Sequence, residues 1–249
     1  MNSVRGLILC GGQGVRLRPI TYYFQKTMIP VGTKQKPLLE YVVRLFRFHS
    51  VRNLAFLVNY KSEQIFNYFD DGNRFDVKIS YVNDKPDLKG TAGSVLNACK
   101  QGVVTHKDTL LVYYGDILSN MNLKNLLQYH ETQQASATVA LCRGFNVRVG
   151  VADLDRDNKI LGFVEKPKIE KPVSMGILVL KGETIDDVEQ LCEKKRDVDL
   201  MRDLVPHLIK KGKPVYGYLS DDFWYDVGSM EAYEKLNPKL VEDLLAYLF

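Results

Sequence analysis

The stretch Val4-Arg5-Gly6-Leu7-Ile8-Leu9-Cys10, followed at once by Gly11-Gly12-Gln13-Gly14, decides the fold of this chain. Apart from Arg5, its first part is an apolar run, which predicts a strand buried on both faces. A glycine-rich turn directly after such a strand lets the backbone approach a ligand closely. The opening of the chain therefore predicts an α/β fold with a ligand site at the end of its first strand.

Strands and helices alternate over the residues that follow. The predicted strands cover 54–58, 77–82, 110–114 and 137–142. The predicted helices begin near Pro37, at Ser62 as N-cap and at Asn122 as N-cap, and a segment of small residues covers 90–94. This alternation is typical of a Rossmann-like three-layer α/β/α fold, in which a mostly parallel mixed sheet is covered by helices on both faces.

The second part of the chain has a different rhythm. The pattern predicts a hairpin around the turn 155–158, strands over 173–180, 214–219 and 224–227, and helices over 185–193 and 200–210. Two short helices are expected near the end, on either side of Pro238. The organisation we expect is one domain over residues 1–228 and a short helical C-terminal tail over residues 229–249.

The composition excludes several classes of protein. Hydrophobic residues make up 45% of the 249 residues, enough for a sizeable core, and a charged share of 26% excludes wholesale disorder. Lys and Arg number 34 against 30 Asp and Glu, a net charge of +4, and the basic runs are not interleaved with aromatic residues. We therefore expect no nucleic-acid partner, whereas the mild positive charge suits a small anionic substrate.

Cysteines and apolar segments bear on localisation and assembly. The four cysteines lie far apart in apolar stretches, which favours free thiols in a reducing compartment. No apolar run approaches the ~18 residues of a membrane span, and residues 1–10 do not resemble a signal peptide. We expect a cytoplasmic protein without a membrane partner. Leu244, Leu245 and Phe249 are apolar residues expected to be exposed, and they suggest a homo-oligomer.

Phosphate is the ligand that the glycine-rich turn favours. The Gly-Lys-Ser/Thr of a Walker motif is absent, and Leu17 and Pro19 break the dinucleotide-binding fingerprint. Arg16 follows the turn, and a guanidinium beside converging backbone amides is well suited to phosphate. Lys26, ten residues further on, is a candidate second cation for a triphosphate.

Two carboxylates are candidate metal ligands. Asp116 follows an apolar strand, and Asp226 lies in the apolar sequence Trp224-Tyr225-Asp226-Val227-Gly228. Two hard oxygen ligands beside a phosphate-binding turn suit Mg²⁺ bound to phosphates. The four histidines lack metal-ligand spacing, and no Gly-x-Ser-x-Gly motif supports a nucleophilic serine.

In their order along the chain, these motifs resemble the signature of the sugar-1-phosphate nucleotidyltransferases. They are Gly11-Gly12-Gln13-Gly14-Val15-Arg16-Leu17-Arg18-Pro19, Lys26, Pro30-Val31-Gly32, Lys36-Pro37-Leu38-Leu39-Glu40, Gly90-Thr91-Ala92-Gly93, Gly115-Asp116, Glu165-Lys166-Pro167 and Trp224-Tyr225-Asp226-Val227-Gly228-Ser229. Each motif alone is weak, whereas the ordered set is specific and spans essentially the whole chain. The resemblance implies that residues 1–228 catalyse the condensation of an NTP with a hexose 1-phosphate, with glucose or mannose 1-phosphate favoured, to give an NDP-sugar and pyrophosphate.

The resemblance also implies a role for each matched residue. Arg16 and Lys26 would be the catalytic cations, and Asp116 and Asp226 would coordinate Mg²⁺ as the cofactor. The residues that would bind the nucleotide are Gly11, Gly12, Gly14, Asn83, Gly90 and Thr91. The residues that would bind the sugar phosphate are Gly150, Glu165 and Lys166.

Departures from the family pattern keep alternatives open. Val15 and Gln25 stand where the family commonly has threonine and proline. Asn83 stands where it often has Glu or Gln, which leaves the base open, and Ser174 stands where it commonly has asparagine, which leaves the sugar open. One alternative is a regulatory subunit that binds nucleotide sugar without turnover, and another is the same fold acting on a phosphorylated alcohol such as phosphocholine. A Rossmann oxidoreductase is a more distant alternative.

Overall fold

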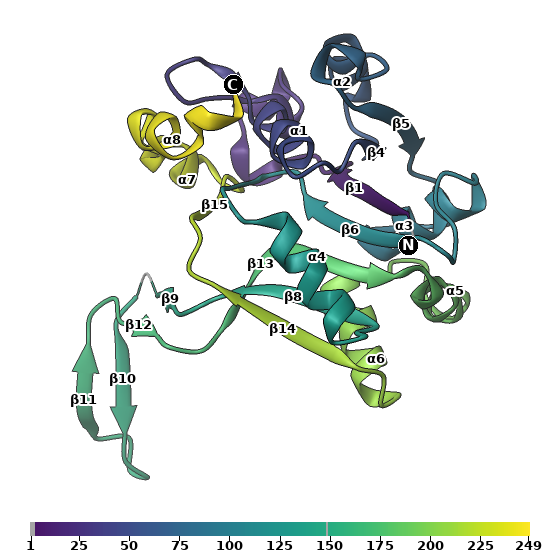
Figure 1. Cartoon of the computed structure of the whole chain (residues 1–249). Helices are drawn as coiled ribbons and strands as arrows, with labels where there is room; N and C mark the ends of the chain where they lie inside the picture. The colour runs from purple at the N-terminus through teal and green to yellow at the C-terminus, as the bar shows by residue number, and fades with distance from the viewer. Residues whose placement is uncertain (1–2, 148) are drawn as a thin grey trace.

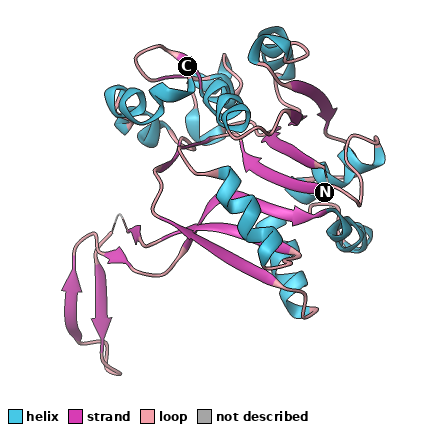
Figure 2. Cartoon of the chain, in the orientation of Figure 1, coloured by secondary structure: helices cyan, strands magenta, loops and turns pink. Residues whose placement is uncertain are grey.

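A seven-stranded sheet forms the centre of the computed structural model, which describes residues 3–147 and 149–249 (Figures 1 and 2). Its order is β14-β8-β13-β6-β1-β4-β5, and β13 runs antiparallel to the other six strands. The strands are β1 (Val4–Cys10), β4 (Asn53–Val58), β5 (Lys78–Asn83), β6 (Thr109–Tyr114), β8 (Ala137–Cys142), β13 (Val173–Lys181) and β14 (Val215–Ser220). The predicted mostly parallel mixed sheet is confirmed.

Helices cover both faces of this sheet, each over its own hydrophobic core. Neighbouring residues of β1 illustrate the division, because Leu7 belongs to one core and Ile8 to the other, as the alternation along a strand requires. The Ile8 face carries α1 (Leu38–Phe48), α2 (Ser62–Phe69), α4 (Leu123–Thr132), α7 (Met230–Lys235) and α8 (Pro238–Leu245). The Leu7 face carries α3 (Gly90–Lys100), α5 (Ile185–Lys194), the π-helical turn Leu200–Leu204 and α6 (Val205–Lys210). The three-layer α/β/α architecture is thus confirmed.

Helix boundaries follow the expected signals in part. The side chain of Asn122 caps α4 by accepting a hydrogen bond from the backbone N–H of Asn125 at 3.0 Å, as predicted. The prediction of Ser62 as an N-cap is wrong, because Lys61 precedes α2 in the left-handed region with φ 53° and Ser62 is the first helical residue. The small-residue segment at 90–94 forms the first turn of α3, a helix that the sequence pattern did not predict.

The C-terminal segment packs into the same core as β1 and α1. Val241, Leu245 and Leu248 are buried there, and the guanidinium of Arg44 lies over the ring of Phe249. The expectation that Leu245 is exposed is therefore wrong, since its side chain faces the core. Leu244 is half-buried and Phe249 is exposed, so only Leu245 is lost as an argument for a contact between copies of the chain, and a homo-oligomer remains a prediction.

A two-stranded arm projects from the body of the molecule (Figure 1). Its antiparallel strands are β10 (Val151–Leu154) and β11 (Ile160–Val164), joined by the predicted turn. At its base, β9 (Phe145–Asn146) pairs with β12 (Lys168–Ile169). The arm exposes many apolar side chains, namely Val149, Val151, Leu154, Ile160, Leu161, Phe163, Val164 and Ile169.

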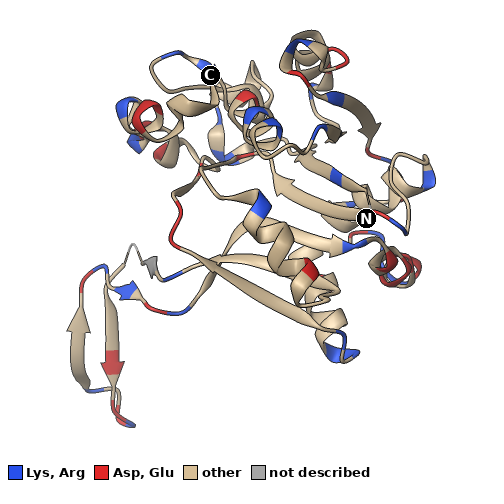
Figure 3. Cartoon of the chain, in the orientation of Figure 1, with Lys and Arg blue, Asp and Glu red and all other residues tan. Residues whose placement is uncertain are grey.

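Charge and hydropathy are distributed as the composition suggests. Figure 3 shows Lys, Arg, Asp and Glu spread over many helices and loops of the described chain. Within that same part of the chain, no helix is both long enough and apolar enough to cross a lipid bilayer.

All four cysteines are free thiols, with Cys10 and Cys142 buried and Cys99 and Cys192 half-buried. The predicted thiol state is confirmed.

Candidate active site

A cavity of about 320 Å³ opens at the carboxyl ends of the parallel strands β1, β5 and β6. The carboxyl edge of a parallel sheet is where α/β proteins bind ligands, because the loops that follow the strands meet there. The lining includes residues from each of these loops, among them Gly12, Lys26, Asp84, Thr91 and Asp116. A cavity therefore lies at the end of the first strand, where the sequence predicts a ligand site.

Each glycine of the turn after β1 has a different environment. Gly14 has φ +62°, and a Cβ there would lie 2.7 Å from Cγ2 of Thr21. At Gly11 a Cβ would lie 2.6 Å from Oδ2 of Asp84, whereas at Gly12 it would meet open space. Gly14 is thus required by its backbone conformation, whereas a side chain at Gly11 would have to displace the Asp84 carboxylate. Gly12 leaves the backbone accessible to a ligand.

Two predicted cationic residues and two predicted carboxylates come together beside this turn. Lys26 Nζ forms an ion pair with a carboxylate oxygen of Asp116. The short strand β15 (Trp224–Asp226) pairs with β7 (Ile117–Ser119), which brings Asp226 next to Asp116. Burial raises the pKa of Asp226 and the charge of Asp116 raises it further, whereas Lys26 and Arg16 lower it. The structure therefore groups Arg16, Lys26, Asp116 and Asp226 although they are far apart in sequence.

The two carboxylates of this cluster fit a magnesium ion that is bound together with phosphates. The backbone N–H of Val227 donates to the carbonyl of Asp116 at 2.9 Å, which fixes the two acidic segments side by side. Among the described residues, no group of three or more His, Cys, Asp or Glu side chains could hold a metal by itself. Mg²⁺ usually binds through one or two carboxylates, water and substrate phosphates, so two aspartates are a sufficient protein share.

Gln25 supports the segment that carries Lys26. Its fully buried side chain donates from Nε2 to the carbonyl of Cys10, and its Oε1 accepts from the N–H of Thr27 at 2.6 Å and from the hydroxyl of Thr27 at 2.7 Å. The backbone N–H of Gln25 donates to Oε1 of Gln64 at 2.7 Å. One side chain thus ties the end of β1 to the turn that presents Lys26. The sequence showed Gln25 only as a departure from a common proline.

Asp84, which the sequence analysis missed, lies in the cavity wall where Asn83 was expected. Asn83 is exposed, is not among the residues that line the cavity, and contacts α3 through its carbonyl, which accepts from Asn97 at 2.8 Å. Side chains alternate along β5, and Val82 packs in the core beneath α3. Counting two residues on from Val82 places Asp84 on that side, and this alternation is the signal that could have found it.

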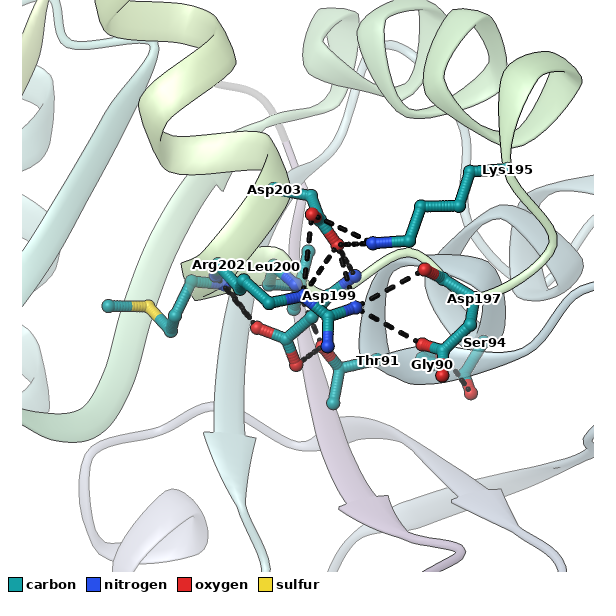
Figure 4. A network of polar contacts seen from close by, with 10 residues as sticks. Gly90, Thr91, Ser94, Lys195, Asp197, Asp199, Leu200, Arg202 and Asp203 are labelled. Carbon is teal, nitrogen blue, oxygen red and sulfur yellow. Dashed lines mark hydrogen bonds and ion pairs between the residues drawn. The ribbon is translucent and has the colours of Figure 1, made fainter.

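Gly90 and Thr91 hold the start of α3 against a neighbouring loop. At Gly90, where φ is +80°, a Cβ would lie 2.4 Å from the carbonyl oxygen of Val198. The hydroxyl of Thr91 donates to Asp199 Oδ2 at 2.8 Å and accepts from the N–H of Leu200 at 2.8 Å (Figure 4). Both predicted residues therefore line the cavity, and the loop fixes their positions.

The same loop is held by an ion-pair network centred on Asp203 (Figure 4). Asp203 accepts hydrogen bonds from Arg202, from Lys195 and from the backbone N–H of Asp199. The adjacent Arg202 guanidinium holds the pKa of Asp203 well below its usual range. Because Asp199 also accepts the hydrogen bond from Thr91, the network holds the loop segment that contacts the cavity wall.

The three predicted sugar-phosphate residues lie apart from this cluster. Gly150, Glu165 and Lys166 belong to the arm and are not among the residues that line the cavity. The side chains of Glu165 and Lys166 are exposed, and their charged groups lie 3.9 Å apart. The cavity lining therefore includes Gly11, Gly12, Gly90 and Thr91 of the predicted nucleotide residues but not Asn83, and the structure does not bring the predicted sugar residues to them.

Comparison with known proteins places the chain in a family. The model of the nucleotidyl transferase family matches residues 5–243, so the chain belongs to that family. It is 33% identical over 244 residues to a UTP–glucose-1-phosphate uridylyltransferase of Synechocystis sp., covering 92% of this chain and 61% of that protein. It is 29% identical over 248 residues to a mannose-1-phosphate guanylyltransferase of Mycobacterium tuberculosis, covering 98% and 66%. The chain thus spans somewhat less than two thirds of the length of these relatives.

The fold also matches solved structures. A crystal structure from Bacillus anthracis, provisionally assigned as a glucose-1-phosphate thymidylyltransferase, superposes with a TM-score of 0.76 at 21% sequence identity. The match covers 97% of this chain and 96% of that one. At this identity the likeness concerns the fold, and it confirms the Rossmann-like class predicted from the sequence.

Proposed function

We propose that this chain transfers a nucleotidyl group from an NTP to a hexose 1-phosphate and releases pyrophosphate. Glucose 1-phosphate and mannose 1-phosphate are the favoured acceptors, in line with the named activities of the relatives. The observation that carries the proposal is the grouping of Arg16, Lys26, Asp116 and Asp226 beside the glycine turn, with Lys26 and Asp116 lining the cavity.

The chemistry of this transfer matches the residues present. A phosphate oxygen of the sugar phosphate attacks the α-phosphorus of the NTP, a new P–O bond forms, and the bond to the pyrophosphate oxygen breaks. The attacking phosphate has a second pKa of about 6, so it is ionised at neutral pH and needs no general base. Catalysis then depends on alignment and on neutralising negative charge. Arg16 and Lys26 supply positive charge where the phosphates would lie.

Magnesium is the cofactor that we propose for this site. Asp116 and Asp226 would hold it together with the substrate phosphates, as their adjacent carboxylates allow. When bound, the ion would neutralise charge on the phosphates. Lys26, which contacts Asp116, would orient that carboxylate and bind phosphate from the same side.

The sugar phosphate would be bound from the arm. Glu165 and Lys166 carry the charge and hydrogen-bonding groups that a hexose 1-phosphate needs, and Gly150 lies opposite them. Because these residues do not line the cavity, we propose that the arm bends toward it when both substrates bind. The free cysteines are compatible with a cytoplasmic location, which we also propose.

Pyrophosphate release tests the proposed function. The purified chain would be mixed with each of ATP, CTP, GTP, UTP and dTTP and with several sugar 1-phosphates, in Mg²⁺ and in EDTA. The expected result is metal-dependent release with at least one pair. Binding of nucleotide sugars without release from any pair would contradict the proposal and favour a regulatory subunit. Release with phosphocholine, and with none of the sugar 1-phosphates, would show that the acceptor is a phosphorylated alcohol.

A further inference from the structure

A second cavity of about 480 Å³ opens at the edge of the sheet opposite to the candidate active site. Val4 and Thr109, at the starts of β1 and β6, line it together with Leu127 of α4. Cys10, at the other end of β1, lines the candidate active site. Because each residue of β1 rises about 3.3 Å, the length of this strand separates the two cavities by about 20 Å. A molecule in the second cavity would therefore not overlap with one in the first.

His130 of α4 lines the second cavity and has a ring nitrogen without a partner. The residue is 3% exposed, and its Nδ1 lies 2.9 Å from the hydroxyl of Thr138 in β8. Thr138 is fully buried, and among the described residues His130 is the only hydrogen-bond partner of its hydroxyl. Because a buried hydroxyl proton needs an acceptor, Thr138 donates to Nδ1, which leaves the proton of the neutral ring on Nε2.

The Nε2–H of His130 is therefore a donor in search of an acceptor. Nε2 is at the tip of the ring, it is buried, and it makes no hydrogen bond within the described part of the chain. Buried polar groups in this state are rare, and the position of His130 in the cavity wall fits an acceptor that belongs to a bound molecule.

Lys181 and Glu131 bring opposite charges to the same cavity. Lys181 ends β13 and is half-buried, whereas Glu131 is exposed at the rim. Burial of the ring, and after it the charge of Lys181, lowers the pKa of His130 to about 4, so the ring is neutral at pH 7. Among the described residues, neither the Lys181 ammonium nor the Glu131 carboxylate has an ion-pair partner. The cavity thus presents two donors in its wall and one carboxylate acceptor at its rim.

We propose that this cavity binds a small organic anion that also carries hydrogen-bond donors. Its carboxylate or phosphate group would accept from His130 Nε2–H and pair with Lys181. Its hydroxyl or ammonium groups would donate to Glu131, and Val4 and Leu127 would contact its carbon skeleton. Sugar phosphates and amino acids share this chemistry. The proposal does not depend on the proposed function, because the two cavities have no lining residue in common.

NMR of the histidine side chains of the full-length chain tests the proposal, since only four histidines contribute signals. The probes are glucose 6-phosphate, glutamate and inorganic phosphate, each titrated without nucleotide. We expect glucose 6-phosphate or glutamate to shift the His130 Nε2–H signal saturably. Lys181→Met should weaken that binding about tenfold or more, the loss of one charge-assisted contact. Lys124→Met, on the exposed surface of α4, is the matched control and should bind like the wild type.

Glu131→Gln separates the two parts of the proposal. Because its side chain is exposed, this variant should fold normally, and it should weaken binding of the organic probe while leaving binding of inorganic phosphate unchanged. The probe that binds identifies the source of the anion. Phosphate that binds as tightly as both organic probes would overturn the proposal in favour of a site for a bare ion. No saturable shift with any probe, or equal shifts in Lys181→Met and the wild type, would also overturn it and leave water as the partner of Nε2.

Discussion

The carboxyl edge of the sheet and the arm are built in opposite ways. At the sheet edge, strands with continuous pairing registers hold their following loops in fixed order, and Lys26, Asp84 and Asp116 face one cavity. The arm is a two-stranded ribbon whose pairing partners lie within the arm itself. Its apolar side chains are exposed, with Phe163 60% exposed, whereas Phe56 of β4 is fully buried.

This difference separates rigid from adjustable parts of the site. A two-stranded ribbon has little stability by itself, and few buried contacts fix its direction. We therefore expect the nucleotide half of the site to be preorganised by the sheet and the sugar half to depend on the position of the arm. Substitutions at the two places should then have different signatures.

The largest effect is expected at the sheet edge. Lys26→Ala removes a cation from the cluster, and we expect kcat for pyrophosphate release to fall by about 10²–10³, as for the loss of one preorganised electrostatic contact. Lys124→Ala, an exposed lysine of α4, is the control and should retain full activity. Steady-state kinetics with saturating substrates measure both. A Lys26→Ala enzyme that keeps most of its activity would contradict the expectation that the sheet edge holds the catalytic cations.

Gln25→Leu tests whether the sheet edge is preorganised by buried hydrogen bonds. The change leaves the carbonyl of Cys10 and the N–H of Thr27 without their partner, which should cost about 1–3 kcal/mol of unfolding free energy. We expect the melting temperature to fall by several degrees. The fold decrease in kcat should exceed the fold increase in the KM for nucleotide. Gln128→Leu on exposed α4 surface is the control. Equal melting temperatures for the two variants would refute the assignment.

Lys166→Ala tests whether the arm serves the sugar phosphate. Loss of a charge-assisted contact should raise the KM for the sugar 1-phosphate roughly tenfold and leave the KM for nucleotide unchanged. The melting temperature should not change, because the side chain is exposed. Lys171→Ala, an exposed lysine just beyond the arm, is the control. A parallel rise of both KM values would place Lys166 in the nucleotide half instead.

The smallest effect is expected for the apolar surface of the arm. Phe163→Ala should change the unfolding free energy by no more than about 0.5 kcal/mol, as exposed substitutions usually do. Phe56→Ala in the core should cost about 3–5 kcal/mol. Denaturant unfolding of both variants gives the comparison. A loss above about 2 kcal/mol at Phe163 that depends on protein concentration would show that a second copy covers the arm.

The sequence predicted best the site residues whose positions are set by the ends of strands. Asp116 follows an apolar strand of the central sheet, so its place at the sheet edge followed from strand prediction, whereas Asp226 reaches it through the pairing of β15 with β7. Asp84 was missed because the facing of a residue depends on where β5 ends, and the alternation had to be counted from a known core residue such as Val82. Gln25 was missed as a support because its partners come from three segments, at Cys10, Thr27 and Gln64.

The arm and the tail were predicted less well for a related reason. The hairpin itself followed from its pattern of strand and turn residues, whereas the direction in which it projects depends on contacts that no local pattern encodes. Leu245 was expected to be exposed because residues of the core that it shares, such as those of β1 and α1, lie some two hundred residues away in sequence. Apolar periodicity predicts that a face is covered, but it does not name what covers it.

The position of Leu248 in the same core as Ile8 has a consequence for synthesis of the chain. A ribosome adds about 5–20 residues per second, so Leu248 is made roughly 12–48 seconds after Ile8. During that time α1 has an uncovered apolar face, since Val241, Leu245 and Leu248 have not yet been made. Until Leu248 emerges, the growing chain therefore exposes apolar surface near the ribosomal exit, the kind of surface that chaperones shield.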